Sequence, residues 1–125
     1  MTLLNFRSSA LRAAAFGAAA LALSSTAFAH AHLVSSEPAA NAAVAAPAEV
    51  TIHFTETLEP AFSKIDLSDA NGKPATQNAS QVDQSDAKVM HLALSPLSAG
   101  HYAVHWTAVA TDGHRTQGNF SFDVK

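Results

Sequence analysis

The 125-residue chain contains no cysteine, which excludes thiolate chemistry and disulfide bonds. The folded chain must therefore be stabilised by packing alone. Methionine is scarce as well, with two residues, and only seven Lys and Arg residues stand against ten Asp and Glu. A chain with so few cations offers no basic patch for nucleic acid or for an anionic membrane surface.

The segment 1–29 has the pattern of a cleaved secretory signal peptide. Arg7 and Arg12 make its start positive, residues 13–23 form an uncharged apolar run, and Ala27-Phe28-Ala29 supplies the small residues of a cleavage site. The apolar run is well short of the ~20 residues that span a bilayer, which argues against a membrane anchor. We therefore predict cleavage after Ala29 and a secreted or periplasmic product.

Cleavage after Ala29 leaves one domain of 96 residues, 30–125, with a single core. Its formal charge is −5, because five basic residues remain against ten acidic ones. Cleavage after Ala31 also satisfies the small-x-small rule and would make His32 the first residue. Phe28 is a more usual middle residue than His30, so the first site is favoured.

Alternation of apolar and polar residues predicts an all-β domain. Candidate strands lie at residues 33–35, 49–56, 62–67, 75–82, 88–94, 101–110 and 119–124. Prolines at both ends of the alanine-rich segment 38–47 favour a turn or a single helical turn there. About seven short strands with turn signals between them, around one tryptophan, predict an antiparallel β-sandwich.

The same alternation assigns most histidines to the sheet surface. His53, His101 and His105 fall on outer or polar faces, whereas His91 is expected to be partly buried and hydrogen-bonded. Trp106 lies on the inward face of the 101–110 strand and is predicted to be a core residue.

A candidate metal-binding motif, Asp112-Gly113-His114, follows the 101–110 strand. Gly113 permits a tight turn, and a carboxylate and an imidazole two residues apart have a metal-ligand spacing. If the mature chain begins at His30, its free α-amine and its Nδ1 can close a chelate ring on one ion. This nitrogen and oxygen set suits Cu(II), with His32 as an additional ligand on the same side of an extended segment.

A second copper chemistry uses some of the same residues. A histidine third from a free amino terminus can bind Cu(II) or Ni(II) through the amine, two backbone amides and the imidazole, and His32 would be that residue. Such a peptide site needs no fold and would not require Asp112 or His114. The folded site is favoured, because it alone explains the Asp-Gly-His turn.

Several motifs together resemble those of the CopC family of periplasmic copper-resistance proteins. They are His30-Ala-His32-Leu, Ser35-Ser-Glu-Pro38, Val50-Thr-Ile-His-Phe-Thr-Glu56, Tyr102-Ala-Val-His-Trp106, Asp112-Gly-His114 and Gly118-Asn-Phe-Ser-Phe122. Their order and spacing cover essentially the whole mature chain, so 30–125 is identified as a CopC-like copper-binding domain.

The resemblance implies a seven-stranded Greek-key β-sandwich or barrel of cupredoxin-like form that binds one Cu(II). It assigns the metal ligands to His30, Asp112 and His114, with His32 joining in members that begin His-x-His. It also implies a CopD-like inner-membrane copper transporter as partner. Some relatives bind Cu(I) in a methionine-rich loop, whereas the only mature methionine here, Met90, lies in a predicted strand.

The function expected from these observations is a non-catalytic, monomeric Cu(II)-binding protein that sequesters copper or delivers it to a membrane partner. Two other readings remain. The terminal histidine resembles the copper brace of lytic polysaccharide monooxygenases, which need an open coordination position and a broad substrate surface. A metal-free Ig-like interaction module is the other, and it would leave the clustering of His30, His32, Asp112 and His114 unexplained.

Overall fold

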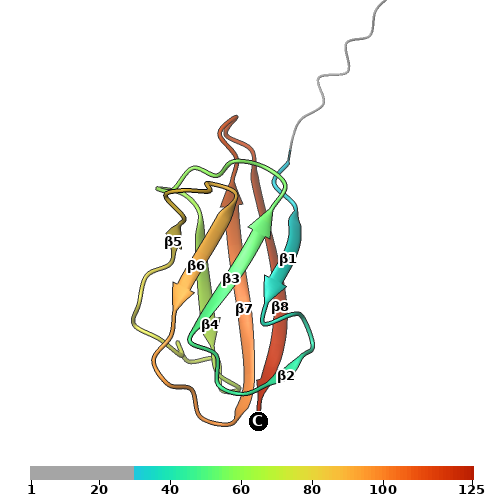
Figure 1. Cartoon of the computed structure of the whole chain (residues 1–125), viewed down its shortest axis with the longest axis vertical. Coiled ribbons are helices and arrows are strands. Elements are labelled where there is room, and N and C mark those ends of the chain that lie inside the picture. The colour runs from blue at the N-terminus through green and yellow to red at the C-terminus, as the bar shows by residue number, and fades with distance from the viewer. Residues whose placement is uncertain (1–29) are drawn as a thin grey trace, which may run out of the picture.

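The computed structural model describes residues 30–125, so the predicted signal peptide lies outside the described residues. This part of the chain forms two packed β-sheets (Figure 1). The strands are β1 (Leu33–Glu37), β2 (Ala43–Val44), β3 (Glu49–Phe54), β4 (Lys64–Ser68), β5 (Gln81–Val82), β6 (Val89–Ala93), β7 (Gly100–Val109) and β8 (Arg115–Val124). Within residues 30–125, no helix is long and apolar enough to cross a membrane.

The two sheets have the orders β1-β3-β6-β5 and β2-β8-β7-β4. All pairings are antiparallel except that of β2 with β8, which is parallel. The predicted antiparallel β-sandwich is confirmed, with eight strands in the described range instead of seven. The additional strand is β2, in the segment predicted to be a turn, where Ala43 and Val44 pair with the end of β8.

The core lies between the sheets and consists of the alternate residues that the pattern placed inward. In β7, Tyr102, Val104, Trp106 and Ala108 are all buried. The Trp106 ring packs edge-to-face on Phe54 of the facing sheet, with centroids 5.1 Å apart. Burial of such large apolar rings stabilises the sandwich without disulfides.

Four predicted strands are shorter than the patterns suggested, and β3 and β6 each lose two residues, because they cover only Glu49–Phe54 and Val89–Ala93. The 62–67 strand begins only at Lys64, because Phe62 belongs to a turn and has 68% of its surface exposed. The weak 75–82 segment pairs only at Gln81 and Val82, on the edge of its sheet. In contrast, β8 is longer than predicted and begins at Arg115, so the β7–β8 turn is confined to a few residues around Gly113.

Candidate metal centre

The β7–β8 turn carries Asp112 and His114 at one end of the sandwich. The Ala110 N–H donates to the His114 carbonyl (3.0 Å), and the Gly113 N–H donates to the Ala110 carbonyl (2.8 Å). Gly113 has φ +90°, a left-handed conformation that glycine adopts without steric cost. The turn therefore holds both side chains on a short, internally bonded loop.

Both carboxylate oxygens of Asp112 face His114. Oδ1 accepts the backbone N–H of His114 (3.0 Å), and Oδ2 lies 2.9 Å from Nδ1 of the same residue. The backbone N–H of His114 is the largest cause, and its side chain the next, of a pKa for Asp112 below the ordinary value. Asp112 is therefore an ionised acceptor, although the two side chains remain 41% and 37% exposed.

The start of β1 lies at the same end of the molecule because β1 and β3 are antiparallel. Leu33 pairs with Phe54, so the residues before β1 lie beside those after β3. Ala31 has no exposed surface, and its carbonyl accepts a hydrogen bond from the Thr116 hydroxyl at the start of β8 (2.6 Å). This anchor ties the residues that flank Ala31 to the hairpin that carries His114.

Thr55 fixes the backbone on both sides of Ala31. Its Oγ1 accepts the His32 N–H (2.9 Å) and donates to the His30 carbonyl (3.2 Å). Its own N–H donates to the His32 carbonyl (2.9 Å). The roles of Thr55 and Thr116 could not be predicted from the sequence, because each contact joins segments distant in the chain.

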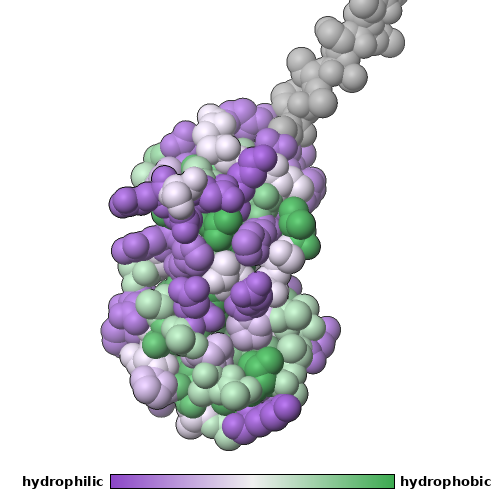
Figure 2. Space-filling view, viewed as in Figure 1, coloured by the Kyte–Doolittle hydropathy of each residue, from purple (hydrophilic) through white to green (hydrophobic). Residues whose placement is uncertain are grey.

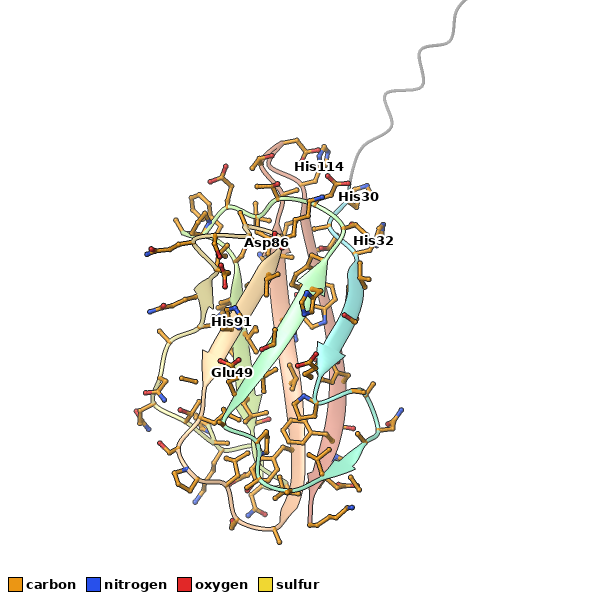
Figure 3. All side chains as sticks on the ribbon, in the orientation of Figure 1. His30, His32, Glu49, Asp86, His91 and His114 are labelled. Atoms are coloured by element: carbon orange, nitrogen blue, oxygen red, sulfur yellow. The ribbon has the colours of Figure 1, made fainter. Side chains whose placement is uncertain are left out.

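The result is a cluster of three imidazoles, those of His30, His32 and His114 (Figure 3), and the Asp112 carboxylate contacts the last of them. The His30 ring lies 5.2 Å from the His114 ring and 6.2 Å from the His32 ring, measured between centroids. The structure thus brings the four predicted ligands to one end of the sandwich. Within residues 30–125, no three His, Asp or Glu side chains already stand in the arrangement of a metal site.

The other histidines lie elsewhere. The predicted surface positions of His101 and His105 are confirmed, and their Nδ1 atoms lie 2.7 Å from Asp123 Oδ1 and Asn119 Oδ1. The prediction for His91 is also confirmed, because its ring is part-buried and bonded to polar neighbours.

Comparison with known proteins identifies the family. Residues 33–125 match the family model for the CopC domain. The chain belongs to the CopC family. It is 40% identical over 114 residues to copper resistance protein C of Xanthomonas campestris pv. juglandis, which covers 86% of this chain and 89% of the relative.

Solved CopC-family structures share the fold. The crystal structure of CopC from Methylosinus trichosporium OB3b matches with a TM-score of 0.72 at 31% identity, over 77% of this chain and 94% of that one. PcoC of Escherichia coli, described as a methionine-rich copper resistance protein, matches with a TM-score of 0.67 at 38% identity, over 78% of this chain and 100% of that one. Here the only methionine beyond Met1 is Met90, which is fully buried in the core.

Proposed function

We propose that this CopC-family protein binds one Cu(II) ion at the end of the sandwich where His30 meets the β7–β8 turn, and that it serves copper resistance and homeostasis in the periplasm. The approach of the His30 and His114 rings to 5.2 Å carries the proposal. The names of its relatives support copper as the ligand, since they describe copper resistance proteins.

The donor atoms fit a tetragonal Cu(II) site. Two ligand atoms at ~2.0–2.1 Å from a metal and at right angles to each other lie about 2.9 Å apart. His114 Nδ1 and Asp112 Oδ2 have that separation. His30 would add its Nδ1, and His32, whose ring lies 6.2 Å from that of His30, is the outermost member of the set.

The remaining donor depends on cleavage after Ala29. In the unprocessed chain the His30 nitrogen belongs to a peptide bond, whose lone pair is delocalised and binds metals poorly. Cleavage turns it into an amine, which forms a chelate with the ring of the same residue.

An amine, two or three imidazoles and a carboxylate would fill the coordination positions of the ion. A filled site favours holding copper over activating a substrate, which requires an open position. The protein would therefore act as a monomeric carrier or store, without catalysis, and a CopD-like membrane transporter is the expected recipient of its copper.

The test is Cu(II) titration of protein purified from the periplasm, with intact mass to fix the amino terminus and electron paramagnetic resonance to report nitrogen ligands. The single tryptophan, Trp106, gives a fluorescence signal for the titration. We expect a chain that begins at His30 to bind one Cu(II), and Asp112→Ala and His114→Ala to weaken binding at least tenfold or to change the spectrum.

His105→Ala is the matched control, since that histidine also bonds a neighbour through Nδ1 but lies on the outer face of β7. It should bind copper as the parent does. If Asp112→Ala and His114→Ala also bind as the parent does, copper sits on the terminal peptide alone. If the parent protein binds no copper, the proposed function is wrong.

A further inference from the structure

A second group of metal-binding side chains lies on the outer face of the β1-β3-β6-β5 sheet, away from His30 and His114 (Figure 3). Glu49 and Thr51 come from β3, and His91 of β6 is paired directly with Thr51. Asp83 follows β5 and reaches His91 from the other side. Two adjacent strands thus supply three of the four side chains, and the fourth comes from the residue that directly follows β5.

Asp83 positions the imidazole ring of His91. Its Oδ2 lies 2.8 Å from His91 Nε2. The other oxygen, Oδ1, accepts hydrogen bonds from the Ser85 hydroxyl (2.7 Å) and from the backbone N–H groups of Ser85 (2.8 Å) and Asp86 (3.0 Å), which hold the carboxylate in place. A carboxylate accepts hydrogen bonds, so this contact favours the His91 tautomer with its proton on Nε2 and its lone pair on Nδ1.

That lone pair faces two oxygen atoms. His91 Nδ1 lies 3.7 Å from Glu49 Oε1 and 3.2 Å from Thr51 Oγ1, and the two oxygens are 3.2 Å apart. Donors bound to one metal at ~2.0–2.2 Å are themselves about 3–4 Å apart, so this triangle needs little adjustment to hold an ion. A hollow of about 370 Å³, lined by Glu49, Asp83 and His91 among others, leaves space for an ion and its water molecules.

The arrangement repeats a known feature of histidine ligands, whose second nitrogen usually donates to a carboxylate that orients the ring and raises its basicity. The His101–Asp123 pair lacks the rest of this arrangement. Its Nδ1 is 2.7 Å from the carboxylate, but both side chains are more than half exposed. His101 has an oxygen atom at one ring nitrogen, whereas His91 has oxygen atoms facing both of its ring nitrogens.

We propose that Glu49 and His91 form a second, weaker metal site that binds Zn(II), with the Thr51 hydroxyl as a third donor and Asp83 as the residue that positions His91. Mixed imidazole and carboxylate ligands suit Zn(II), whereas Ca(II) and Mg(II) prefer oxygen alone. Two strong protein ligands leave several positions to water, in keeping with the lack of a three-residue His, Asp and Glu group within residues 30–125. This site does not depend on the proposed Cu(II) function.

The test uses the mature His114→Ala protein, which removes a ligand of the first site. Zn(II) chloride is titrated by calorimetry, and the ¹⁵N resonances of the imidazoles are followed by NMR. We expect one Zn(II) to bind and to move the His91 Nδ1 resonance. Glu49→Gln and His91→Ala, each made in the same protein, should weaken that binding at least tenfold, whereas His101→Ala should not.

Asp83→Asn separates positioning from ligation. The amide N–H can donate to Nε2, and this contact favours the His91 tautomer that carries its proton on Nδ1, where the metal would bind. The substitution should weaken Zn(II) binding while His91 stays part-buried. Thermal unfolding of each variant shows that it is folded, and Glu49→Gln, at a half-exposed position, is the variant least able to disturb the core. The proposal is wrong if Zn(II) leaves the His91 resonances unmoved, or if His91→Ala and His101→Ala lose Zn(II) equally.

Discussion

The hydroxyl group of Thr55 positions a backbone segment by itself. Because that hydroxyl bonds both the His30 carbonyl and the His32 N–H, it determines where two of the proposed ligands leave the sandwich. Thr116 acts on the residue between them through the Ala31 carbonyl. The sequence indicated the side chains that we propose as metal ligands, but these positioning contacts could be found only from the fold.

Replacing Thr55 with valine should therefore weaken Cu(II) binding while the protein remains folded. Valine has nearly the same shape but neither donates nor accepts, so both hydroxyl bonds are lost. A net value of ~1 kcal/mol for such contacts corresponds to about a fivefold loss of affinity. Competitive titration against a Cu(II) chelator measures it.

Thr76→Val is the control for this substitution. The Thr76 hydroxyl accepts a local hydrogen bond from the Asn78 N–H in an exposed loop, and this bond involves no residue of the histidine cluster. Equal copper affinity of Thr55→Val and the parent protein would show that the terminal segment is placed by Ala31 and β1 alone.

The β7–β8 hairpin contributes both to the core and to the turn that carries Asp112 and His114. One of its glycines leaves the space that the tryptophan ring occupies. Gly118 pairs with Trp106, and a Cβ added at Gly118 would lie 2.5 Å from Cζ2 and 2.7 Å from Cε2 of the indole. The Trp106 ring is confined by Phe54 on the opposite sheet. It cannot move away without disturbing the core.

Gly118→Ala should accordingly destabilise the domain by about 1–3 kcal/mol, the usual cost of overpacking a core. Each kcal/mol lowers the melting temperature of a domain of this size by ~4–8 °C. Ala103→Ser, which adds one atom on the exposed face of β7, should unfold within a degree or two of the parent protein. A melting temperature unchanged by Gly118→Ala would mean that the indole has space that the structure does not show.

Strand periodicity predicted the long strands well and the short ones poorly. The alternate apolar residues of β3 and β7 are all buried, because each strand has one face on the core, although Thr51 and Thr107 on the opposite faces are buried as well. The two-residue strands β2 and β5 have no period to detect and depend on their neighbours in the sheet. The Asp112-Gly113-His114 turn could be predicted as a candidate metal-binding motif from its own residues, whereas its closeness to His30 follows from the β1–β3 pairing.

At the scale of the whole molecule, polar side chains dominate the upper half of the face shown in Figure 2, the half that contains the histidine cluster. The mature domain has a formal charge of −5, which favours the approach of a divalent cation and weakens with salt. In the proposed site the cation is held by nitrogen donors on one side and by Asp112 on the other. These two kinds of donor respond to different ranges of pH.

Copper binding should fall as pH falls from about 8 to about 6, because amine and imidazole nitrogens, with reference pKa values of about 7.7–8.0 and 6.5, must lose their protons to bind. Asp112 should not contribute to this fall. Its pKa lies below the ordinary 3.8 in the folded protein, so its favourable interactions are complete above that value and are lost only as pH falls through the lowered pKa.

Cu(II) retention measured by equilibrium dialysis from pH 8 to pH 3 separates the two donors. A decline centred between pH 8 and pH 6 in the parent protein, shifted to higher pH in Asp112→Asn because its affinity is lower, is the expected result. In that variant the amide replaces the carboxylate without adding a group that titrates. Retention that stays complete down to pH 4 and then collapses would instead place copper on carboxylates, and His30 and His114 could not then be its principal ligands.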